Sequence, residues 1–90
     1  MRRKDADRLL IENEESALFM DGFDYAIIGV GRQHSKQMLV VYSREKCIEV
    51  LVKTQGMTHE EAEEYFSFNC ECAWVGEGTP MIVTTEVGDV

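Results

Sequence analysis

The strongest constraint on the fold is a pair of helix boundaries in the middle of the chain, within "QGMTHEE" at residues 55–61. Gly56 suits the left-handed conformation that often ends a helix. Two residues later, Thr58 and Glu61 form the pattern T-x-x-E, a capping box that opens a new helix. Because only two or three residues separate the two helices, the sequence predicts an αα-hairpin.

Both helices of this hairpin have the pattern of an amphipathic helix. Ser43 is a good N-cap for the first helix, and its apolar residues recur at helical spacing: Cys47, Ile48, Leu51 and Val52. In the second helix we expect the acids to lie on the outer face. The residues expected on its inner face are Ala62, Tyr65, Phe66, Asn69, Cys70 and Ala73.

Short β-branched segments flank the hairpin. "YAIIGVG" (25–31) and "QMLVVYS" (37–43) are predicted strands, and the five polar residues between them favour an antiparallel hairpin over a longer crossover. "MIVTT" (81–85) is a third predicted strand. We therefore expect a two-layer α+β fold, in which the αα-hairpin covers a small antiparallel three-stranded sheet.

A chain of 90 residues is expected to form one domain, which we place at residues 21–85. Residues 1–20 are predicted to be a helical leader interrupted at the polar "ENEE", and residues 86–90 a loose tail. No apolar run is long enough to span a membrane, and acids follow the basic start where a signal peptide needs an apolar core. These features predict a cytoplasmic protein.

The net charge of −8 is concentrated in one part of the chain. Residues 1–53 hold all nine Lys and Arg together with nine acids, whereas residues 54–90 hold eight acids and no Lys or Arg. Nucleic-acid binding depends on Lys and Arg, so direct binding of nucleic acid by the second half is not expected. A basic partner protein suits this half better.

Two glycine-rich segments raise the question of phosphate binding. Gly29-Val30-Gly31 lacks the third glycine and the following helix of a dinucleotide-binding fingerprint. Gly76-Glu77-Gly78-Thr79-Pro80 lacks the lysine and the helix of a P-loop. A bulge or close packing is favoured for the first segment and a turn for the second. Small-molecule binding stays open as an alternative, through Gly29, Gly31, Gly76, Gly78 and Thr79.

The sequence gives no strong sign of a metal, a cofactor or a catalytic group. Cys47, Cys70 and Cys72 show neither the paired spacing of a zinc site nor the even number of a disulfide framework. His34 and His59 are scattered, and no general base can be assigned. A helix N-terminus can lower the pKa of a thiol such as that of Cys47, but its apolar neighbours favour burial.

The acidic helix and the only tryptophan form the predicted contact surface for a partner protein. Acids on the outside of a short helix are usually only solvated, yet an exposed tryptophan often anchors an interface. Hydrophobic residues make up 44% of this small chain, which leaves apolar surface for a further interface and predicts a homodimer. The predicted partner-binding residues are Glu60, Glu61, Glu63, Glu64, Trp74 and Glu77.

Four segments resemble a set of short uncharacterised proteins encoded by bacteriophages and prophages: "DGFDYAIIGVG", "VVYSREKCIEVLV", "GMTHEEAEEYFSFN" and "AWVGEGTPMIV". The resemblance covers residues 21–84, while the leader and Cys70-Glu71-Cys72 lie outside the pattern. It implies a phage accessory protein acting in the cytoplasm of a bacterial host, in takeover or counter-defence. It implies no reaction, so we expect a non-enzymatic protein that binds a host or defence protein.

Overall fold

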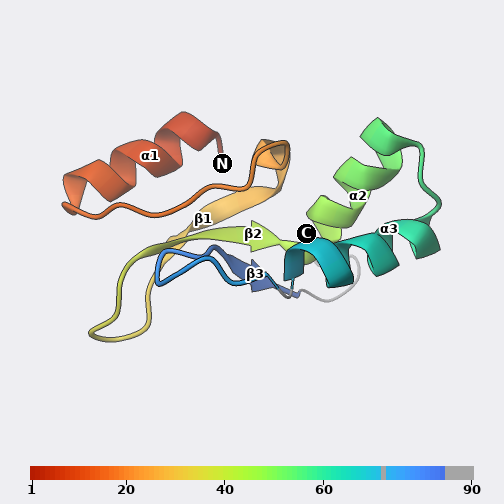
Figure 1. Ribbon diagram of the computed structural model, residues 1–90. Coiled ribbons are helices and arrows are strands. Elements are labelled where there is room, and N and C mark those ends of the chain that lie inside the picture. Colours follow the sequence, from red (N-terminus) through yellow and green to blue (C-terminus); the bar gives the residue numbers. More distant parts are fainter. Residues whose placement is uncertain (72, 85–90) are drawn as a thin grey trace.

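The computed structural model describes residues 1–71 and 73–84, and in these residues three α-helices accompany a three-stranded sheet (Figure 1). The predicted α+β class is confirmed. In chain order the elements are α1 (Arg3–Glu12), the 3₁₀ turn η1 (Asp24–Ala26), β1 (Ile27–Gly31), β2 (Leu39–Ser43), α2 (Arg44–Gln55), α3 (His59–Phe66), the π-helical turn η2 (Ser67–Glu71) and β3 (Met81–Val83).

The predicted αα-hairpin is present, with the expected caps. The Ser43 hydroxyl accepts a hydrogen bond from the backbone N–H of Lys46, and Gly56 ends α2 with a φ of 70°. Thr58 and Glu61 form both bonds of the capping box, at 3.1 and 2.9 Å. Local chemistry alone therefore determines where α2 ends and α3 begins.

The sheet has the order β1-β2-β3, and its two strand pairs run in opposite senses. β1 and β2 form the predicted antiparallel hairpin. β2 and β3 are parallel, so the prediction of an entirely antiparallel sheet was wrong for this pair. The long α2–α3 connection is a crossover, which brings the chain back beside the start of β2 and lets β3 run in the same direction.

The glycine pair in β1 coincides with a β-bulge. Ile27 is opposite Tyr42 while Gly29 is opposite Val41, so the register shifts between Ile27 and Gly29 and Ile28 is left exposed. Of the two alternatives favoured for this segment, a bulge or close packing, this shift in register matches the bulge.

The leader contributes to the core, but only its first part is helical. Figure 1 shows α1 lying along the sheet on the side of β1, while α2 and α3 lie beyond the carboxyl end of β2. Ala6 and Leu10 of α1 are buried in the same cluster as Ile27, Val40 and Phe66. The sheet is therefore covered by α1 as well as by the αα-hairpin.

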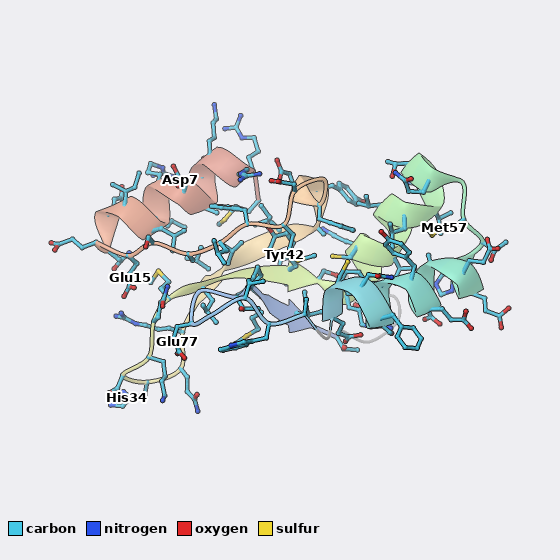
Figure 2. All side chains as sticks on the ribbon, viewed as in Figure 1. Asp7, Glu15, His34, Tyr42, Met57 and Glu77 are labelled. Carbon is cyan, nitrogen blue, oxygen red and sulfur yellow. The ribbon has the colours of Figure 1, made fainter. Side chains whose placement is uncertain are left out.

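Residues 13–20 are not helical, and we call them the connecting segment. The Asn13 side chain caps the carbonyl of Leu9 at 2.8 Å, and Glu14 has a φ of 57°, so α1 ends at Glu12. The segment is then fixed to the sheet, because the backbone N–H of Met20 donates to the Tyr42 hydroxyl at 2.7 Å. Figure 2 shows Tyr42 at the centre of the molecule.

None of the helices formed by the described residues has the length and apolar character needed to cross a membrane.

Candidate functional site

An apolar groove of about 670 Å³ lies between the connecting segment, the chain after η2 and the beginning of β3. Twelve of its sixteen lining residues are apolar or cysteine; the four others are Asp21, Asn69, Glu71 and Thr79. The complete lining is Leu18, Phe19, Met20, Asp21, Phe23, Leu39, Asn69, Cys70, Glu71, Ala73, Trp74, Val75, Thr79, Pro80, Met81 and Ile82.

Large apolar side chains are exposed along this groove. Trp74 is 69% exposed, and Val75 and Met81 are also exposed. Burial of an indole normally contributes strongly to stability, so an exposed one next to an apolar groove is typical of a binding surface. The structure thus places Trp74, one of the predicted partner-binding residues, at the edge of a concave site.

The segment "GEGTP" forms the predicted turn. Gly76 has a φ of 114°, and its carbonyl accepts a hydrogen bond from the backbone N–H of Thr79 at 3.1 Å. The Thr79 hydroxyl donates to the same carbonyl at 2.7 Å and accepts from the N–H of Val75 at 2.9 Å. The backbone N–H of Thr79 is therefore already used inside the turn and is not available to a phosphate.

Gly78 attaches this turn to the connecting segment. Its carbonyl accepts a hydrogen bond from the N–H of Leu18 at 3.1 Å. A Cβ atom at Gly78 would lie only 3.4 Å from Nε2 of Gln37 and 3.6 Å from Cα of Ala17. These are ordinary van der Waals distances, so the turn packs directly against the connecting segment.

The four glycines of the small-molecule alternative do not meet. Gly29 and Gly31 belong to β1, whereas Gly76 and Gly78 precede β3, and β2 lies between these two strands. None of the four is among the lining residues of the groove, although Thr79 is.

The predicted acidic face is also divided. Glu60 and Glu64 of α3 are exposed, and neither forms an ion pair with another described residue. Glu61 is engaged in the capping box, and Glu63 pairs with Arg44 at 3.7 Å. Figure 2 shows Glu77 in the other half of the molecule from Met57, which lies two residues before the start of α3. Glu77 and α3 therefore do not form one surface.

Arg44 is a positioning residue that the sequence did not reveal. It begins α2, and its guanidinium donates to Glu71 Oε1 and to the Ser67 hydroxyl, both at 3.1 Å, in addition to the pair with Glu63. These contacts raise the pKa of Arg44, chiefly through the hydrogen bond to Glu71. Arg44 therefore fixes η2, which ends three residues before Trp74, to the start of α2. No local pattern in the sequence pairs Arg44 with Ser67 or Glu71, because these residues lie 23 and 27 positions further along the chain.

The described thiols are those of Cys47 and Cys70, whereas Cys72 lies outside the described residues. Burial raises the pKa of Cys47 to about 12 and also raises the pKa of Cys70. Burial therefore outweighs the effect of the helix N-terminus on Cys47, and both thiols are protonated near neutral pH. Among the described residues, no three His, Cys, Asp or Glu side chains form a cluster suited to a metal ion.

The raised pKa of Cys47 predicts a loss of stability at alkaline pH. The thiol ionises near 9.0 in the unfolded chain but near 12 in the folded one. Its contribution to the free energy of unfolding is therefore complete below pH 9 and is lost as the pH rises towards 12. Urea unfolding between pH 7 and 11 checks this, and Cys47→Ala should reduce the alkaline decline more than Cys70→Ala does. An equally steep decline in Cys47→Ala and in the unsubstituted protein would contradict the assignment to this thiol.

Comparisons with protein-family models, with curated proteins and with solved structures found no match to this chain.

Proposed function

We propose that this protein is a non-enzymatic phage accessory protein that binds a host or bacterial defence protein in the cytoplasm of the bacterial host. The phage context is supported by the sequence resemblance of residues 21–84. The binding role is supported by one structural observation: an apolar groove of about 670 Å³ with the exposed Trp74 at its edge.

The groove is the centre of the proposed contact, and the acids have a secondary role. Tryptophan is the residue type most enriched at positions that dominate binding energy, and its effect is largest where it enters or borders a pocket. Glu60 and Glu64 are exposed on α3 and supply negative charge. Charges outside the buried contact mainly increase the rate of association and favour partners of opposite charge.

A small-molecule binder is the second candidate, because the groove has a volume typical of ligand pockets, which is about 300–1,000 Å³. The lining contains two carboxylates and no Lys or Arg. An apolar or cationic compound would fit this lining better than the nucleotide-like ligand expected from the glycine segments. Thermal-shift assays with nucleotides and with apolar compounds separate these ligand classes.

We also propose that the protein self-associates as a homodimer through exposed apolar side chains outside the groove, such as Ile11 and Ile28. Mass measurement in solution tests this.

The main test is capture of a partner from bacterial lysate at low salt, comparing three forms of the protein. Trp74→Ala should remove at least about 90% of a partner that the unsubstituted protein retains, as expected for loss of about 1.4 kcal/mol or more. Tyr25→Ala is the control, because Tyr25 is a 58% exposed aromatic residue that lies by Lys46 and does not line the groove. Retention of the same partner by all three forms, or of none by the unsubstituted protein, would contradict the proposal.

A further inference from the structure

The groove has a charge pattern that selects among protein partners. Its lining includes Asp21 and Glu71 but no Lys, Arg or His. Each of these acids shares its arginine with a second acid: Arg3 lies 3.4 Å from Asp21 and 3.5 Å from Asp24, and Arg44 lies 3.1 Å from Glu71 and 3.7 Å from Glu63. Ten of the sixteen lining residues come from residues 69–82, within the part of the chain that holds eight acids and no Lys or Arg. The potential over the groove is therefore negative, which favours a cationic occupant.

The strand beside the groove favours an extended occupant. Residues 79–82 line the groove as a continuous run that includes the start of β3. Within the described residues, β3 pairs only with β2, so the backbone groups on its other edge have no strand partner. An extended peptide can add to such an edge through backbone hydrogen bonds, while every second side chain enters the neighbouring pocket.

From these observations we propose that the groove binds an extended peptide segment in which apolar side chains alternate with Lys or Arg. The apolar side chains occupy the groove beside Trp74, and the cations lie at its rim, near the carboxylates of Asp21 and Glu71. This inference rests on the proposed function, and it specifies the chemistry of the partner at the same site.

A second copy of this chain is a poorer occupant. A dimer formed at the groove would bring together two copies of the segment that carries the whole net charge of −8. Like charges across an interface oppose association.

Trp74 provides the measurement, because it is the only tryptophan in the chain and it is 69% exposed. Three blocked heptapeptides are titrated into the full chain: alternating Lys and Ile, alternating Glu and Ile, and alternating Lys and Ser. The Lys/Ile peptide should shift the indole emission to shorter wavelength in a saturable way, and added salt should weaken it. The Glu/Ile peptide should bind at least about tenfold more weakly, and the Lys/Ser peptide should cause no shift.

Addition to β3 is tested with two further Lys/Ile peptides, methylated at the odd or at the even backbone nitrogens. Only one of the two should lose binding, because a strand donates hydrogen bonds to its neighbour from every second residue. Equal loss or equal retention in both would overturn strand addition. Equal binding of the Lys/Ile and Glu/Ile peptides would overturn the charge preference.

Two outcomes separate this inference from the proposed function. If the Lys/Ile peptide causes no shift while Trp74-dependent capture of a protein persists, the peptide chemistry is wrong and the proposed function stands. If the emission instead shifts as the concentration of the chain itself rises, the occupant is a second copy and the inference is overturned.

Discussion

Replacing Phe66 by alanine is expected to lower the free energy of unfolding by about 3–5 kcal/mol. Phe66 is completely buried, and its ring packs edge-to-face with Phe23 at a centroid distance of 5.9 Å. The substitution removes the transfer free energy of the ring and leaves a cavity between α3 and the rest of the core. Since small domains have only about 5–15 kcal/mol of stability in total, this is a large fraction.

Phe68→Ala is the matched control, because it makes the same chemical change two residues later on a side chain that is 83% exposed. We expect it to change the stability by no more than about 0.5 kcal/mol. Urea unfolding followed by circular dichroism measures both variants. Similar losses of stability in the two variants would mean that Phe68 is as buried as Phe66, which would contradict the path of the chain through η2.

Replacing Leu10 by alanine is expected to cost about 2–5 kcal/mol, even though the sequence placed this residue in a leader outside the domain. Leu10 is only 2% exposed and packs in the same cluster as Ile27 and Val40. A loss of this size, with a single cooperative transition, would show that α1 unfolds together with the sheet.

Ile11→Ala serves as the control for Leu10→Ala. Ile11 is the next residue along α1, it is 66% exposed, and its replacement should cost little. If the two variants have equal stability, or if Leu10→Ala unfolds in two separate transitions, α1 is not part of the same cooperative unit.

The hairpin of helices shows what local sequence could predict. Its boundaries follow from Ser43, Gly56 and the Thr58–Glu61 capping box, and the hydrogen bonds of these caps join residues three positions apart in sequence. Such interactions depend on nearby residues alone, so their residue types are sufficient evidence. The turn at Gly76 was predicted for the same reason.

The course of the chain after Phe66 could not be predicted in this way. Helical periodicity placed Tyr65, Asn69 and Ala73 on the inner face, whereas all three are exposed. Asn69 and Ala73 leave that face because α3 ends at Phe66 and one π-helical turn follows. Arg44 holds that turn from α2, more than twenty residues earlier in the chain. A contact over that separation leaves no periodic pattern in the sequence.

The candidate site, like the fold, was predicted only in part. The sequence by itself determined the α+β class, the β1–β2 hairpin, the helix caps and the acidic second half. Only the tertiary structure decided that β3 runs parallel to β2, that α1 completes the core, and that Trp74 borders a groove made from three separate segments. The physical reason is that caps and turns are satisfied by neighbouring residues. A groove, in contrast, exists only where segments distant in sequence are packed side by side.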